Sequence, residues 1–187
     1  MWEKSGISIT TKLKVFKAVV LPSLLYGCES WTVYARHAKK LNSFHMRCLR
    51  SILRIKQEDK IPDTEVLELA KAESVFFLLK RAQLRWAGHV FRMEDSRIPK
   101  QLLYSELASG SRKRGRPKLR FKDTLKASLQ DSEIDPQTWE QLASDRPAWR
   151  HQVWKGATSY ENKRIAKKKE QRRRRKEREA NAAYPVH

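Results

Sequence analysis

The sequence predicts an all-α protein: an irregular helical bundle with a basic loop and a long basic C-terminal helix or tail. Apolar residues recur at helical spacing along most of the 187 residues, and short polar turns separate these stretches. Lysine and arginine dominate the C-terminal end. With 40% hydrophobic residues and six tryptophans, the chain has enough apolar side chains to form a packed core.

The first third of the chain contains the clearest helical patterns. Residues 11–21 place apolar side chains three and four positions apart, and Pro22 is expected to end or kink this helix. Residues 23–34 are rich in aromatic and β-branched residues, so helix and extended chain are both open there. Residues 36–55 predict an amphipathic helix with basic residues outside its apolar stripe. That stripe consists of Leu41, Phe44, Cys48, Leu49, Ile52 and Ile55.

The remaining helices are shorter, with one exception. Pro62, Asp63 and Thr64 suit the start of a short helix that ends near Ala70. Residues 74–93 predict a second long helix, in which Gly88 costs roughly 1 kcal/mol relative to alanine. A glycine there indicates the close approach of a neighbouring segment. Further helices are expected at residues 102–107, 119–129 and 136–143, and from residue 145 into the basic tail.

Four parts are therefore expected along the chain. Residues 1–108 form a first helical domain, and residues 109–118 form an exposed basic loop with glycine and proline. Residues 119–160 form the C-terminal helices. Residues 161–187 form a basic tail that is either helical or disordered.

The net charge of +20 is the dominant chemical feature. Residues 161–187 hold eleven lysines and arginines against four acidic residues, so most of the excess lies outside the tail. Such a surplus favours a polyanionic partner, with nucleic acid before an anionic membrane surface. The longest apolar stretch, residues 18–25, is interrupted by Pro22 and Ser23, so no membrane span is expected. Two cysteines and no signal-peptide pattern favour a reducing, intracellular environment.

The first candidate nucleic-acid-binding site is the basic loop. Its Arg-Gly-Arg-Pro core resembles an AT-hook, in which glycine allows close approach to the minor groove and proline keeps the chain extended. An ordinary connector that contacts phosphates without reading sequence is the alternative interpretation. The candidate residues are Arg112, Lys113, Arg114, Arg116 and Lys118.

The second candidate site is the C-terminal basic run. Its like charges repel one another, so we expect it to become helical on a phosphate backbone. The same composition suits a nuclear-localisation signal, and a solvated tail without either role is the remaining alternative. The candidate residues are Lys167, Lys168, Lys169, Arg172, Arg173, Arg174 and Arg175.

Two further groups of residues have less specific patterns. The tryptophans Trp86, Trp139, Trp149 and Trp154 have the chemistry to stack on unpaired bases, although most tryptophans of a helical protein belong to its core. Cys28, His37, His45 and Cys48 have the chemistry of zinc ligands. Their spacing is not that of a familiar zinc finger. Buried thiols and surface imidazoles are therefore favoured, and neither a metal nor another cofactor is expected.

Three segments resemble the region that follows the polymerase palm in non-LTR (LINE-type) retrotransposon reverse transcriptases. They are Lys-Leu-Lys-Val-Phe-Lys-Ala-Val-Val-Leu-Pro-Ser-Leu-Leu-Tyr-Gly-Cys-Glu-Ser-Trp-Thr (12–32), Arg-Trp-Ala-Gly-His-Val-Phe-Arg-Met (85–93) and Arg-Phe-Lys-Asp-Thr-Leu-Lys (120–126). The resemblance extends from about residue 5 to about residue 176. It implies that residues 1–108 are thumb-like and grip a template–primer duplex.

The resemblance also implies what this chain lacks. The family places its paired catalytic aspartates in a Phe/Tyr-x-Asp-Asp hairpin, and this tetrapeptide is missing from the sequence. We therefore expect a truncated, non-enzymatic fragment that binds RNA or DNA. A full-length reverse transcriptase supplied in trans is a further expected partner. The expected location is the nucleus, or the cytoplasm as a ribonucleoprotein.

Two alternatives remain open. A host chromatin- or RNA-binding adaptor would use the Arg-Gly-Arg-Pro loop as its anchor. An inert product of a degenerate element would leave the surface that normally packs on a palm exposed, including Phe16, Val20 and Trp31.

Overall fold

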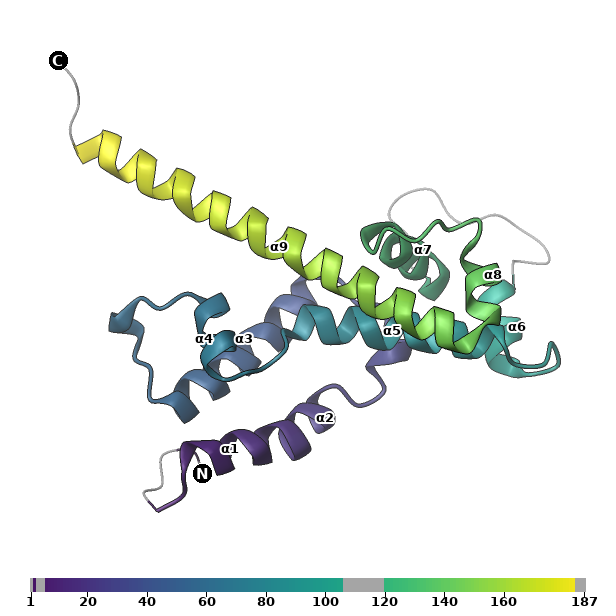
Figure 1. The fold of residues 1–187 in the computed structure, drawn as a ribbon, viewed down its shortest axis with the longest axis horizontal. Helices are drawn as coiled ribbons and strands as arrows, with labels where there is room; N and C mark the ends of the chain where they lie inside the picture. The colour runs from purple at the N-terminus through teal and green to yellow at the C-terminus, as the bar shows by residue number, and fades with distance from the viewer. Residues whose placement is uncertain (1, 3–5, 106–119, 184–187) are drawn as a thin grey trace.

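The computed structural model describes residues 2, 6–105 and 120–183, and the all-α prediction is confirmed. The described residues form helices and turns, with no strand among them (Figure 1). Their order is α1 (Ile9–Val15), a π-helical turn (Phe16–Val20), α2 (Leu21–Leu24), a 3-10 turn (Cys28–Ser30), α3 (Ala35–Leu53), a second 3-10 turn (Gln57–Asp59), α4 (Asp63–Leu69), α5 (Val75–Phe91), α6 (Ile98–Tyr104), α7 (Phe121–Asp131), α8 (Trp139–Ser144) and α9 (Arg146–Ala183).

The first helical segment does not end at Pro22, which was one of the two outcomes expected there. Ser8 caps α1 by accepting a hydrogen bond from the backbone N–H of Thr11. The helix then widens into a π-helical turn, in which the N–H of Leu21 bonds to the carbonyl of Phe16. Pro22 occupies the second position of α2, where a missing N–H is tolerated, and α2 continues to Leu24.

The amphipathic helix α3 is confirmed, but its buried face is rotated from the predicted stripe. Cys48, Leu49 and Ile52 are buried as expected. Phe44 is 42% exposed, whereas its neighbour His45 is fully buried. The rotation arises because the first helical segment covers the His45 side of α3, where the rings of Phe16 and His45 stack with centroids 5.5 Å apart.

The buried Phe16 also corrects the expectation that the thumb-like surface is open. It is 0% exposed and belongs to a cluster formed by α1, the π-helical turn, α3 and α4. Val20 and Trp31, the other two residues expected to be exposed, are half-buried. Exposed apolar side chains do remain on the first helical segment, namely Ile7, Ile9, Val19 and Tyr26.

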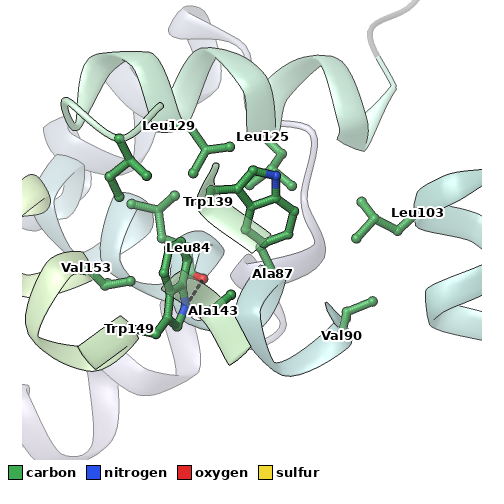
Figure 2. Packing of buried hydrophobic residues seen from close by; sticks show 11 residues of the cluster. Leu84, Ala87, Val90, Leu103, Leu125, Leu129, Trp139, Ala143, Trp149 and Val153 are labelled. Atoms are coloured by element: carbon green, nitrogen blue, oxygen red, sulfur yellow. Dashed lines mark hydrogen bonds between the residues drawn. The ribbon is translucent and has the colours of Figure 1, made fainter. Parts of the chain in front are cut away.

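Helix α5 is the central element of the fold. It contacts α3, α6, α7, α8, α9 and the 3-10 turn Cys28–Ser30. Ser74 caps it by accepting a hydrogen bond from the N–H of Phe77, at 3.1 Å. Its C-terminal half lies in a second cluster with α7, α8 and the start of α9 (Figure 2).

Gly88 lies where the indole of Trp149 meets α5, which confirms the close approach expected from the sequence. A Cβ atom at position 88 would lie 2.1 Å from Nε1 of Trp149 and 2.4 Å from its Cδ1. The same Nε1 donates a buried hydrogen bond to the carbonyl of Leu84, at 3.1 Å (Figure 2). Glycine is therefore required for α9 to pack this closely on α5.

A half-buried lysine on α5, Lys80, connects this helix to α7 and α9. Nζ of Lys80 on α5 donates to Oδ2 of Asp131 at 2.9 Å and to Oγ of Ser128 at 3.2 Å, both on α7. It also lies 4.6 Å from the ring centroid of Tyr160 on α9. Burial lowers the pKa of Lys80, and Asp131 opposes this shift. Lys80 therefore links α5, α7 and α9 at one point.

We expect Gly88→Ala to lower the free energy of unfolding by up to about 2 kcal/mol. Overpacking against the fixed indole costs about 1–3 kcal/mol, which exceeds the gain of about 1 kcal/mol in helix propensity. Urea unfolding measures the difference. His89→Ala, at the exposed neighbouring position, is the matched control, and we expect it to change stability by less than about 0.5 kcal/mol.

Trp149→Phe tests whether the destabilisation comes from this packing. The smaller ring relieves the clash, so the double variant Gly88→Ala/Trp149→Phe should lose less stability than the sum of the single variants. An additive result, or a stabilised Gly88→Ala variant, would contradict the packing described here.

Candidate nucleic-acid interface

All seven tail candidates lie on α9, in the half of the helix that extends past α5 (Figure 1). Residues 161–183 of the tail are therefore helical, and they are continuous with the part of α9 that packs in the core. Arg172 is half-buried, and the other six are exposed: Lys167, Lys168, Lys169, Arg173, Arg174 and Arg175. The structure thus presents these charges on one continuous helix.

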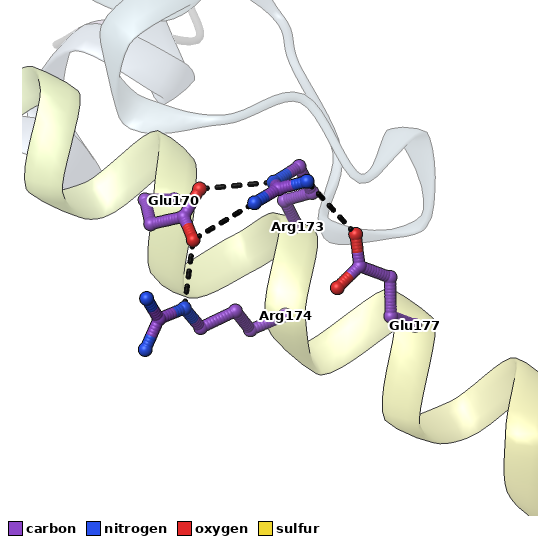
Figure 3. Close-up of polar contacts among 4 residues, drawn as sticks. All are labelled: Glu170, Arg173, Arg174 and Glu177. Atoms are coloured by element: carbon purple, nitrogen blue, oxygen red, sulfur yellow. Dashed lines mark hydrogen bonds and ion pairs between the residues drawn. The ribbon is translucent and has the colours of Figure 1, made fainter.

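Acidic residues at helical spacing offset the repulsion within the arginine run. Glu170 accepts hydrogen bonds from Nε and Nη2 of Arg173, at 2.9 and 3.0 Å, and from Nε of Arg174, at 2.7 Å. Arg173 also pairs with Glu177, at 3.2 Å (Figure 3). These i,i+3 and i,i+4 pairs stabilise the helix. The expectation that this segment needs a phosphate backbone to become helical overlooked them.

Most arginines in this half of α9 have an acidic partner, whereas its lysines have none among the described residues. Arg175 pairs with Glu179 at 3.3 Å, so three of the four arginines in the run have an acidic partner. No ion pair within the described part of the chain involves Lys167, Lys168, Lys169, Lys176 or Arg178. Their charges are the ones left available for an external anion.

Two arginines attach α9 to the first half of the protein. Nη2 of Arg172 donates to the carbonyl of Lys60, at 3.2 Å. The guanidinium of Arg164 lies 4.4 Å from the ring centroid of Phe76 on α5. Arg164 also forms two hydrogen bonds to Glu161, which raise its pKa. These contacts fix the direction of α9 relative to α4 and α5.

The loop candidates Arg112, Lys113, Arg114, Arg116 and Lys118 lie outside the described residues. The AT-hook interpretation of this loop therefore stays a prediction. The described chain resumes at Arg120, whose backbone N–H and guanidinium bond to Asp123 at the start of α7.

The four tryptophan candidates have two different environments. Trp139 and Trp149 are 6% and 2% exposed and belong to the core around α5. Trp86 is half-buried and packs edge-on against Phe121, at 5.0 Å between centroids. Trp154 is 56% exposed on α9. Of the four, Trp154 has the most accessible indole.

The metal-ligand candidates are not brought together. Cys28 and Cys48 lie in different hydrophobic clusters, and His37 is exposed on the first turn of α3. Within the described residues, no group of three or more His, Cys, Asp or Glu side chains could hold a metal ion. Burial raises the pKa of Cys28 to about 11 and also raises the pKa of Cys48. Both thiols are protonated near neutral pH, which makes them poor nucleophiles.

His45 was expected to be a surface imidazole, and this expectation is wrong. Its ring is 0% exposed, and neither ring nitrogen has a hydrogen-bond partner among the described residues. Burial lowers its pKa from 6.5 to about 4, so the ring is neutral at pH 7. A neutral imidazole stacked on Phe16 therefore acts as part of the core.

The sequence is similar to that of a transposon-derived protein. The chain is 26% identical over 152 residues to an uncharacterised transposon-derived protein of Caenorhabditis elegans, covering 76% of this chain and 54% of that protein. It spans about half the length of this curated relative. No protein-family model matches the sequence, and no solved structure matches the chain.

None of the helices in the described part of the chain is long and apolar enough to cross a membrane. The longest, α9, has 38 residues and is strongly charged along its second half.

Replacing His45 should change how stability depends on pH. Its folded pKa of about 4 lies below the ordinary 6.5, so the unfolded chain binds the proton more tightly. The wild-type protein should therefore lose about 3 kcal/mol as the pH falls from 6.5 to 4. His45→Leu should remove this loss. It should also stabilise the fold at pH 7 by about 1 kcal/mol, because two buried nitrogens without partners are eliminated.

Chemical unfolding at pH 7, 5.5 and 4 measures the effect, and His37→Leu on the same helix is the matched control. We expect the exposed His37 to leave the pH profile unchanged. If His45→Leu and the wild type lose stability in parallel over this range, the buried neutral imidazole is not the cause.

Glu170→Gln should loosen the second half of α9 at neutral pH. Arg173 and Arg174 lower the pKa of Glu170 to about 2, so its support for the helix is complete above pH 4.5 and is lost as the pH falls toward 2. Cα chemical shifts of residues 171–178 report helicity. The variant and wild type should differ at pH 7 and converge near pH 2. Glu68→Gln, which removes the same charge from α4, should leave these shifts unchanged; an equal effect would argue against specific pairing.

Proposed function

We propose that this chain is a non-catalytic, nucleic-acid-binding fragment of a retrotransposon reverse transcriptase, which is an RNA-directed DNA polymerase. It binds the backbone of RNA or DNA through the basic second half of α9. The observation that carries the proposal is that the exposed lysines 167–169 make no ion pair within the described chain, while α9 itself is fixed by its packing on α5.

The dimensions of this helix suit a duplex backbone. At about 1.5 Å per residue, residues 167–178 extend over about 18 Å. A DNA duplex presents one phosphate charge per about 1.7 Å of its axis, so about ten charges lie alongside this segment. Lysine and arginine contacts to these phosphates release counterions, which favours binding without sequence specificity.

Two sequence similarities support the proposed origin of the chain. The relative in Caenorhabditis elegans is described as transposon-derived. The segments 12–32, 85–93 and 120–126 resemble the region after the palm of LINE-type reverse transcriptases. The sequence contains no Phe/Tyr-x-Asp-Asp tetrapeptide, which supports a non-enzymatic role for this chain. We further propose a location in the nucleus or in a cytoplasmic ribonucleoprotein, with a full-length polymerase in trans as a partner.

Replacing three lysines of α9 should weaken binding and its dependence on salt. We expect the triple variant Lys167→Gln/Lys168→Gln/Lys169→Gln to reduce the slope of log K against log salt concentration by about 0.7–0.9 for each phosphate that the helix no longer binds. Fluorescence anisotropy with a labelled duplex across a salt series measures the slope. The control variant Lys39→Gln/Lys40→Gln/Lys126→Gln removes the same net charge from exposed positions on α3 and α7.

Equal slopes for the two triple variants would show that net charge, and not binding by α9, governs affinity. No binding of the wild type at low salt would refute the proposed function. An Arg114→Ala/Arg116→Ala variant identifies the adaptor alternative. If it abolishes a preference for AT-rich duplex while the α9 variant has no effect, the basic loop is the binding element.

A further inference from the structure

The first turns of α9 form a second basic surface, distinct from the tail. Arg146, Pro147, Arg150, His151 and Trp154 line an open depression of about 500 Å³. The five residues occupy positions i, i+1, i+4, i+5 and i+8, so they share one face of the helix. The proposed function above does not use this surface.

The indole of Trp154 faces away from the core. Trp149 lies five residues earlier, which at about 100° per residue places the two side chains on different sides of the helix. Trp149 is 2% exposed and packs against Gly88, whereas Trp154 is 56% exposed. Its neighbours on this face are the side chains of Arg150, Arg146 and His151. An aromatic face beside arginines is the surface on which unpaired bases stack.

Positive charge is concentrated at this end of α9. Arg92, at the C-terminus of α5, donates to the carbonyl of Ala143, at 2.5 Å. Burial lowers the pKa of Arg92, and the nearby charge of Arg146 lowers it further. Neither Arg146 nor Arg150 forms an ion pair among the described residues, and this includes the adjacent Asp145. An anion bound here would relieve the repulsion between Arg92 and Arg146.

We infer that this surface binds an unpaired nucleotide, with its base stacked on the indole of Trp154 and its phosphate contacted by Arg150 and Arg146. Arg150 and Trp154 are four residues apart, so their Cβ atoms are about 6 Å apart on the helix surface. One nucleotide bridges such a separation between its base and its phosphate. Arginine adds a planar, bidentate contact to phosphate oxygens.

The surface around Trp154 should bind a single strand in preference to a duplex. In a duplex each base already stacks on its neighbours, so an exposed indole has no base face to contact except at an end. The lysines of α9 contact backbone phosphates, which both kinds of strand present. The inference rests on the proposed function and adds a preference for unpaired segments to it.

Trp154→Ala tests the inference with a labelled uridine homopolymer of about ten nucleotides and a duplex of equal charge. Stacking on an aromatic residue accounts for a loss of about 5- to 150-fold in single-strand affinity. Duplex affinity should change by less than about 2-fold. Trp154→Phe should retain part of the single-strand affinity. Tyr26→Ala, which removes an 85% exposed aromatic residue after α2, is the matched control and should have no effect.

Crosslinking locates the binding surface directly. An oligonucleotide with 5-iodouracil should crosslink on irradiation to the peptide that contains Trp154, and an Arg150→Ala variant should reduce the yield more than Arg150→Lys. Equal losses for Trp154→Ala and Tyr26→Ala, or crosslinks only in the tail, would overturn the inference while leaving the proposed function intact. An unchanged affinity of Trp154→Ala for the single strand would likewise overturn the inference.

Discussion

The contact between Trp149 and Gly88 determines where the proposed binding surfaces lie. The indole occupies the volume that any side chain at position 88 would need, and its N–H is bonded to the carbonyl of Leu84 one turn earlier. This contact fixes α9 in both distance and rotation about its axis. Because α9 is a single helix of 38 residues, the rotation set by Trp149 also sets the direction of Trp154 and of every lysine beyond it.

Charge is distributed unevenly along α9, and the distribution follows from the spacing of its acidic residues. Glu170, Glu177 and Glu179 lie within about one turn of the arginines that they neutralise. The preceding lysine triplet has no acidic residue at i+4 or i−4 that pairs with it among the described residues. A run that looks uniformly basic in the sequence therefore contains an internally paired half and a half available to phosphates.

The sequence predicted features that depend on local pattern and missed those that depend on which helix covers which. Gly88 could be predicted to allow a close approach because an interior glycine destabilises a helix unless packing requires it. The rotation of α3 could not be predicted, because Phe44 and His45 are adjacent and only the position of α1 decides which is buried. His45 has a polar side chain, yet the ring of Phe16 covers it. For the same reason, Trp149 and Trp154 could not be distinguished before α5 was placed against α9.

The packing of the first helices bears on whether they need a partner surface to cover them. If the first helical segment needed a partner to cover it, Phe16 would be open to water, and exposure of a phenylalanine forgoes about 1.5–3 kcal/mol. Phe16 is instead completely buried between α1 and α3, and Lys17 adds a hydrogen bond of 2.7 Å to the carbonyl of Lys71 beyond α4. Ile7, Ile9, Val19 and Tyr26 remain exposed there, and exposed apolar side chains are common on folded proteins. The buried side of the first helical segment is therefore covered by this chain's own contacts.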